Sequence, residues 1–197
     1  RHVTVLKAYP FIGLMGYCAG ENPLSYPETD FNMVLQLVSA AAKLVDFVIL
    51  DCGSNMTTVF TPAAIASGDL VIRILTPDLK GVNYLKAHQP LLTDERFHYD
   101  RHLTFAGMAR PFHAFDEMGY IIGGFDGLLP YGKEIDRCAT EGGMFQALKY
   151  CNAKYTAALN KVLELMEQAE PGLAQDTAVP AADVTEGTED EEELSDE

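Results

Sequence analysis

The residue whose type and position most clearly suit a chemical role is Asp51, which directly follows the uninterrupted apolar run Phe47–Leu50. A carboxylate at the tip of a buried strand can hold the water shell of Mg²⁺ beside a nucleotide phosphate. Gly53 follows two residues later, and a glycine there would let the next segment move with the state of a bound nucleotide. Asp is also common after strands, where it caps a turn, so Asp51 by itself leaves both interpretations open.

These residues need elements that hold them in place, and the spacing of apolar residues predicts alternating strands and helices. Continuous apolar runs are typical of strands buried on both faces of a parallel sheet. We expect strands over the ranges 3–6, 47–50, 70–75, 102–106 and 120–125. Apolar residues that recur every three or four positions predict amphipathic helices. We expect these over the ranges 31–45, 61–67, 79–92, 112–118 and 142–170, with little regular structure over 9–29.

The alternation of strands and helices predicts an α/β fold with a doubly wound, mostly parallel sheet. In such sheets, ligands bind beyond the carboxyl ends of the strands. The loops that follow the expected strands are therefore the places where a binding site should lie. This applies to Asp51, to the Thr76–Pro77 pair and to the segment after Met108.

The net charge of −15 is concentrated at the carboxyl end of the chain. Residues 171–197 contain ten acidic residues and no lysine or arginine, which leaves −5 on residues 1–170. We therefore predict one folded domain over 1–170 and a disordered acidic tail over 171–197. A mildly acidic domain is poorly suited to tight, sequence-independent DNA binding across its whole surface.

The sequence also indicates a compartment. It has no run of about 18 to 20 apolar residues, so we expect no membrane-spanning helix. The four cysteines are widely separated and form no Cys-x-x-Cys pair, which favours free thiols over a zinc site or a disulfide scaffold. We therefore predict a cytoplasmic protein.

The order of these segments resembles the ParA/MinD family of P-loop ATPases, a SIMIBI-class family with a deviant Walker A motif. In that family an apolar strand ends in Asp before a small-residue switch, as in Val45–Gly53. A short helix and an Asp then lead into a strand that ends in Thr-Pro, as in Ala63–Asp69 and Ile74–Asp78. The family's late loop frames the nucleotide base, and Leu128–Ile135 and Ala139–Gly143 resemble it.

The resemblance implies a role for each matching position. Asp51 would position Mg²⁺ and the attacking water, and Gly53 would begin the switch, so these two are the expected catalytic residues. Arg110 could stack on a base, because guanidinium groups lie well against aromatic faces. The positions expected to bind the nucleotide are Thr76, Pro77, Arg110, Pro130, Tyr131 and Gly132.

The phosphate-binding loop of the family is absent from this sequence. These ATPases carry Lys-Gly-Gly-x-Gly-Lys-Thr after their first strand, and no such segment occurs here. The segment Gly127-x4-Gly132-Lys133 matches the general P-loop pattern, but Glu134 stands where Ser or Thr would bind Mg²⁺. Pro130 also removes a backbone N–H that a phosphate cradle would use. We therefore expect a P-loop NTPase-like sheet that lacks the first strand and P-loop.

A second departure concerns the base. The family tends to place an Asn that reads adenine after the strand that ends here at Met108, and this chain has Ala109-Arg110-Pro111. Truncation at the amino end would explain the missing loop, whereas a degenerate, non-catalytic relative would explain both departures. A third interpretation keeps the scaffold but binds a different nucleotide or cofactor.

Two functions follow from the resemblance. In the first, the chain is part of an ATPase that partitions or positions DNA or a cellular assembly through ATP-dependent dimerisation. Its cofactors would be ATP and Mg²⁺, provided that the missing P-loop is supplied. Its partners would be a second copy and DNA or an assembly protein, with no integral membrane contact. In the alternative, a degenerate relative acts as a protein-interaction module without ATPase activity.

Overall fold

A three-stranded parallel sheet forms the centre of the molecule in the computed structural model, which describes residues 3–142 and 153–169. The strands are β3 (Val71–Leu75), β4 (His102–Ala109) and β5 (Gly127–Pro130), in the order β3-β4-β5. The predicted α/β fold with a parallel sheet is confirmed. Strand β4 lies in the middle, where Phe105 and Ala106 are fully buried.

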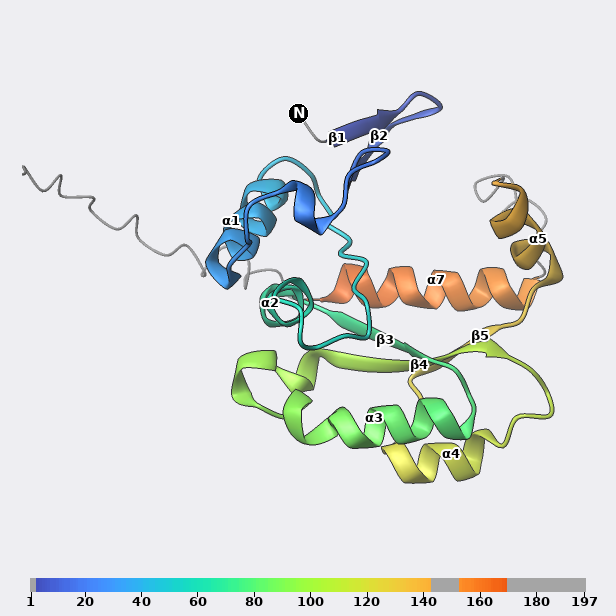
Figure 1. Cartoon of the computed structure of the whole chain (residues 1–197). Helices are drawn as coiled ribbons and strands as arrows, with labels where there is room; N and C mark the ends of the chain where they lie inside the picture. Colours follow the sequence, from blue (N-terminus) through green and yellow to red (C-terminus); the bar gives the residue numbers. More distant parts are fainter. Residues whose placement is uncertain (1–2, 143–152, 170–197) are drawn as a thin grey trace, which may run out of the picture.

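Helices lie on both faces of this sheet (Figure 1). In that view α3 and α4 lie below the sheet and α7 lies above it, while α1 and α2 lie near the amino end of β3. The six α-helices described are α1 (Phe31–Ala42), α2 (Phe60–Ser67), α3 (Leu79–Leu92), α4 (Phe115–Ile122), α5 (Lys133–Glu141) and α7 (Ala153–Gln168). Three short 3₁₀ turns, η1 (Pro23–Ser25), η2 (Glu95–Phe97) and η3 (Tyr99–Arg101), complete the helical elements.

Two buried clusters hold these layers together. The first joins β3 to α3 and α4 through Leu75, Val82, Leu85, Leu92 and Ile122. The second joins α1 to α2 through Val34, Leu35, Val38 and Ala63, with Leu50 packed against it. Burial of such apolar side chains is the main favourable term in folding, and it fixes which face each helix presents to the core.

Helices α1 and α3 each begin directly after an aspartate that caps the first turn. The Asp30 carboxylate accepts a hydrogen bond of 2.8 Å from the backbone N–H of Met33, and Asp78 accepts one of 2.7 Å from Gly81. Both contacts satisfy a donor that the first turn of a helix leaves free. The predicted helix over 79–92 is confirmed, and the one predicted over 31–45 ends at Ala42.

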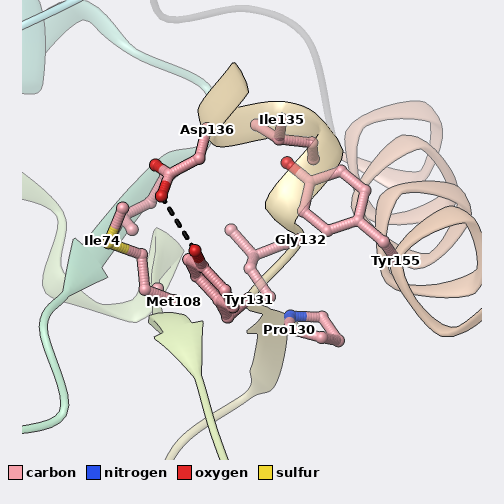
Figure 2. A pocket seen from close by; sticks show the side chains of 10 residues that line it. Ile74, Met108, Pro130, Tyr131, Gly132, Ile135, Asp136 and Tyr155 are labelled. Carbon is pink, nitrogen blue, oxygen red and sulfur yellow. Dashed lines mark hydrogen bonds between the residues drawn. The ribbon is translucent and has the colours of Figure 1, made fainter. Parts of the chain in front are cut away.

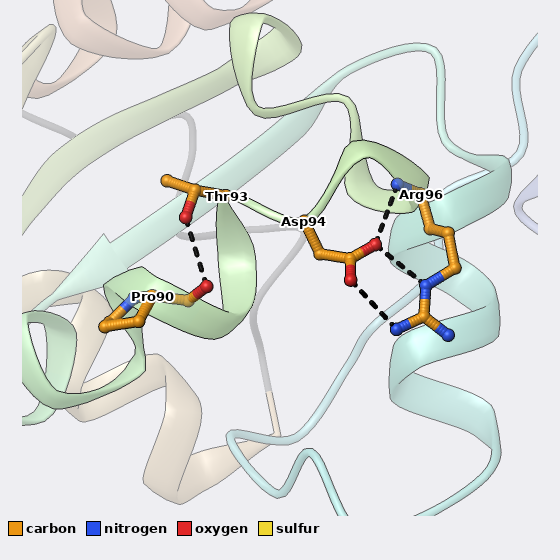
Figure 3. A network of polar contacts seen from close by, with 4 residues as sticks. All are labelled: Pro90, Thr93, Asp94 and Arg96. Atoms are coloured by element: carbon orange, nitrogen blue, oxygen red, sulfur yellow. Dashed lines mark hydrogen bonds and ion pairs between the residues drawn. The ribbon is translucent and has the colours of Figure 1, made fainter.

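The end of α3 is fixed by a local polar network (Figure 3). The Thr93 hydroxyl donates to the Pro90 carbonyl at 3.1 Å, and the Asp94 carboxylate accepts from the backbone N–H of Arg96 at 3.0 Å. Asp94 also pairs with the Arg96 guanidinium at 2.8 Å. These hydrogen bonds lower the pKa of Asp94 to about 2, because they stabilise its charged form.

The amino-terminal hairpin stands apart from the sheet. Strand β1 (Val3–Leu6) pairs in antiparallel fashion with β2 (Tyr9–Met15), as Figure 1 shows. The strand predicted over 3–6 is confirmed, but the expectation of little regular structure over 9–29 is wrong for β2. Phe11, Gly13 and Met15 are every second residue of β2 and therefore lie on one face of the strand, with Ile12 and Leu14 on the other face. Such a segment forms a hairpin strand once a partner strand lies beside it.

The strand predicted over residues 47–50 does not form in the structure. These residues have no strand or helix assignment, and Phe47 and Ile49 are 56% and 79% exposed. A strand needs a hydrogen-bonded neighbour, and within the described part of the chain β3 pairs only with β4. The apolar run is therefore present without the ladder that would bury it.

The end of the sheet also differs from expectation. The predicted strand over 120–125 is wrong, because α4 continues to Ile122 and stops at Gly123, whose φ of 92° suits glycine. The third strand is Gly127–Pro130 instead. The helix predicted over 112–118 begins at Phe115. The helix predicted over 142–170 is described from Ala153 to Gln168, and residues 143–152 and the predicted tail lie outside the described residues.

Candidate functional site

The carboxyl ends of β3, β4 and β5 border a cavity of about 220 Å³ (Figure 2). Ile74 lines it from β3, Met108 from β4 and Pro130 from β5, and Tyr155 reaches it from α7. The lining is mostly apolar, as is usual in pockets that bind small molecules. Because ligands of parallel α/β sheets bind at this edge, we take the cavity as the candidate functional site.

An irregularity in β4 directs Met108 into the cavity. The pairing of β4 with β5 shifts between Ala106 and Ala109, so that one extra residue of β4 bulges out of the ladder. Met108 occupies this bulge with a φ of 52°, a left-handed conformation that is rare for a residue with a side chain. Such strained positions concentrate at binding sites. The sequence pattern placed the end of a strand here and gave no sign of the bulge.

Tyr131 connects the cavity to two charged residues. The Arg110 guanidinium carbon lies 4.0 Å from the centroid of the Tyr131 ring, a cation–π geometry. The Tyr131 hydroxyl donates to the Asp136 carboxylate at 2.9 Å, which Figure 2 marks with a dashed line. This hydrogen bond is the main reason that the pKa of Tyr131 is raised, since ionisation of the phenol would break it.

The structure brings together the late-loop residues predicted to border a base. Pro130, Tyr131 and Gly132 all line the cavity, and Arg110 reaches it through Tyr131. Arg110 was expected to stack on a base, and in the structure a face of its guanidinium lies over the Tyr131 ring.

The predicted Thr76–Pro77 pair follows the carboxyl end of β3, but neither residue lines the cavity. Pro77 is buried and Thr76 is exposed. The Thr76 carbonyl accepts from the backbone N–H of Asp78 at 2.8 Å, and a Cβ on Gly81 would come within 2.2 Å of that carbonyl oxygen. These contacts fix the turn from β3 into α3. Thr76 is therefore accessible to a ligand, whereas Pro77 supports the turn.

Asp51 and Gly53 lie in an exposed loop outside the cavity lining. The adjacent Cys52 thiol is half-buried, and burial raises its pKa, with a smaller contribution from the negative charge of Asp51. Within residues 3–142 and 153–169, no group of three or more His, Cys, Asp or Glu side chains could enclose a metal ion. A single exposed carboxylate still fits Mg²⁺, which keeps several waters and binds through one or two carboxylates plus phosphate oxygens.

The segment after Asp51, residues 53–58, is held by contacts that the sequence did not reveal. We call these residues the switch segment. The Thr61 hydroxyl, from α2, donates to the Gly53 carbonyl at 3.4 Å. The Tyr84 hydroxyl, from α3, donates to the Ser54 carbonyl. Both helices therefore hold the start of the switch segment through hydrogen bonds to its backbone.

Sequence reasoning missed several residues that the structure places at the site. Ile74 and Tyr155 sit in elements that were predicted, but their direction depends on how β3 and α7 pack. Asp136 was missed because α5 was not predicted, although the first turn of that helix carries two acidic residues, which is a usual start signal. The bulge at Met108 and the Tyr84 contact leave no local signal in the sequence.

No family model and no curated protein matches the chain. The structure is similar to the crystal structure of a ParA family ATPase from Chlorobium tepidum TLS, with a TM-score of 0.64 and 18% sequence identity. The match covers 77% of this chain and 62% of that ATPase chain. At this identity the similarity concerns the fold alone, so the chain has a ParA-like fold. Among the described residues, no helix combines the length and apolarity needed to cross a membrane.

Proposed function

We propose that this chain is the switch and base-binding part of a cytoplasmic ParA/MinD-like ATPase. ATP would bind at the carboxyl edge of the sheet, with its base in the cavity beside Tyr131. ATP-dependent dimerisation would then couple nucleotide binding to the partitioning or positioning of DNA or of a cellular assembly. In a complete, doubly wound sheet, the P-loop would follow a strand that the described residues do not contain.

The ParA-like fold combined with a cavity at this edge carries the proposal. The cavity has a flat aromatic ring at Tyr131 and an apolar floor at Ile74 and Met108, which suits the two faces of a base. Arg110 and Asp136 place one positive and one negative group beside the Tyr131 ring, where they could contact polar atoms on the edge of a base.

The outer edge of β3 leaves room for a further strand to pair with it. Within the described residues this edge has no partner, and the apolar residues 47–50 have none either. A parallel strand placed against β3 would bury part of this exposed apolar surface. A lysine-bearing loop at the end of such a strand would supply the charge for the phosphates, and Asp51 would then hold hydrated Mg²⁺ beside them.

The proposal is tested by measuring ATP binding and Mg²⁺-dependent hydrolysis on the full-length protein and its Asp51→Ala variant. We expect Asp51→Ala to lower the rate of hydrolysis by about 100-fold or more, because it removes a group that stabilises charge in the transition state. Asp116→Ala is the matched control, since Asp116 is an exposed carboxylate on α4, away from the cavity. A full-length protein that binds no ATP, or an Asp51→Ala variant with normal hydrolysis, would contradict the proposal.

A second candidate is a non-catalytic relative that binds a partner protein. It is favoured by the apolar Met108, which lines the cavity near the position where the family tends to carry an adenine-reading Asn. In this case the full-length protein would hydrolyse no ATP, and Asp51→Ala would leave partner binding unchanged. Sedimentation of the full-length protein with and without ATP separates the two candidates, because only the ATPase should dimerise on adding nucleotide.

A further inference from the structure

The switch segment is attached to α3 through one long-range hydrogen bond. The Tyr84 hydroxyl donates to the Ser54 carbonyl, and the two residues are separated by 30 positions in the sequence. Met56, in the same segment, packs against the cluster that contains Val82 and Leu85 of α3. The segment therefore contacts α3 through a hydrogen bond and packs against the cluster formed by β3, α3 and α4, and neither contact follows from local sequence.

The Tyr84 ring is itself held in place. It stacks on the His88 ring one turn further along α3, with centroids 4.0 Å apart and an angle of 26° between the planes. His88 Nδ1 lies 2.8 Å from the Tyr84 carbonyl oxygen. A carbonyl only accepts, so this nitrogen carries the proton. The stack restricts the Tyr84 side chain and directs its hydroxyl to Ser54.

The later part of the switch segment, residues 55–58, also has internal hydrogen bonds. The Asn55 side-chain oxygen accepts from the backbone N–H of Thr57 at 2.9 Å and from the Thr57 hydroxyl at 2.7 Å. The Thr58 hydroxyl donates to the Asn55 carbonyl at 3.0 Å. Ser54, whose carbonyl makes the Tyr84 contact, directly follows Gly53, so a displacement of Gly53 would reach that contact through a single peptide bond.

We propose that Tyr84 is a positioning residue that couples the switch segment to α3, so that nucleotide-dependent movement near Asp51 changes the conformation or exposure of α3. This coupling rests on the proposed nucleotide binding. The exposed side of α3 includes Leu79 and Leu91, which are 74% and 42% exposed.

The test uses amide hydrogen exchange on the full-length protein, with and without ATP and Mg²⁺, for wild type and Tyr84→Phe. The phenylalanine keeps the ring and its stack on His88 but removes the donor. Without nucleotide, we expect exchange in the switch segment to rise about two- to tenfold, the effect of losing one net hydrogen bond. With nucleotide, wild type should show altered exchange in α3, and Tyr84→Phe should lose that alteration while keeping its affinity for ATP.

Two controls separate coupling from a merely structural role. Tyr120→Phe removes a hydroxyl from a residue of α4 that is 92% exposed, and it should leave every exchange rate unchanged. His88→Ala removes the stack but keeps the Tyr84 hydroxyl, and it should weaken the coupling less than Tyr84→Phe does. A melting temperature of Tyr84→Phe close to that of wild type would show that any lost coupling does not reflect unfolding.

The outcomes distinguish this inference from the proposed function. If wild type binds ATP and Tyr84→Phe retains the nucleotide-dependent change in α3, the coupling is wrong and the proposed function stands. If wild type binds no ATP, the proposed function fails and the coupling to nucleotide fails with it. In that second case, unchanged exchange in the switch segment of Tyr84→Phe would also exclude the Tyr84 contact as a structural restraint.

Discussion

Strand β3 and the apolar residues 47–50 show how differently the same kind of sequence can behave. Strand β3 pairs with β4, and Phe105 of β4 is fully buried. Residues 47–50 form no ladder, and Ile49 is 79% exposed. Strand β3, with the sequence VIRIL, and residues 47–50, with the sequence FVIL, are both short and rich in β-branched side chains, so β-propensity does not explain the difference.

The difference lies in the neighbours that each segment meets. The Phe105 ring lies over Gly127 of β5, so closely that a Cβ there would come within 2.3 Å of it. Among the described residues, Leu50 packs against the cluster that joins α1 to α2. In consequence the base side of the candidate site is built by the strands of the sheet, whereas the segment around Asp51 is held by side-chain contacts from α2 and α3 and has no strand pairing.

The largest effect should come from shortening a buried aromatic side chain. We expect Phe105→Ala to lower the free energy of unfolding by about 3 to 5 kcal/mol, because it leaves a cavity in the middle of the sheet. The matched variant Phe47→Ala removes the same atoms from a 56% exposed side chain, and it should cost less than about 1 kcal/mol. Urea unfolding of both variants measures this. Equal losses would show that residues 47–50 are buried in solution.

A smaller effect should distinguish two glycines near the site. Gly81→Ala should lower the free energy of unfolding by about 1 to 3 kcal/mol, because its Cβ would overlap the Thr76 carbonyl. Gly53→Ala meets no atom closer than 4.0 Å, and it should stay within about 0.5 kcal/mol of wild type. Thermal unfolding of the two variants provides the comparison. A strongly destabilised Gly53→Ala would mean that the switch segment is more tightly packed than the structure shows.

The smallest effect should be a pH dependence at the start of β4. Burial lowers the pKa of His102 below its ordinary value of 6.5, while its Nε2 lies 2.8 Å from the Phe97 carbonyl oxygen. As pH falls below 6.5, the unfolded chain takes up this proton before the folded one, so stability decreases. Melting temperatures between pH 7.5 and 5.5 should therefore fall by a few degrees more in wild type than in His102→Gln. Identical slopes would exclude His102 as the cause.

The sequence by itself determined the elements whose signals are local. Asp30 and Asp78 cap their helices because a carboxylate can bond to the free N–H groups of its own first turn. Strand β3 and helix α3 lie close to the predicted ranges because the apolar spacing and the end signals agree. The order of these elements also carried the resemblance to ParA/MinD proteins, and the similarity of the fold to a ParA family ATPase agrees with it.

Only the tertiary structure decided which residues meet at the site. A run such as 47–50 becomes a strand only if a neighbour supplies its hydrogen bonds, and that neighbour is not encoded in the run. The bulge that directs Met108 into the cavity depends on the register between β4 and β5. The contact of Tyr84 with Ser54 joins positions 30 residues apart. Such contacts depend on the packing of whole elements, so local spacing in the sequence carries no record of them.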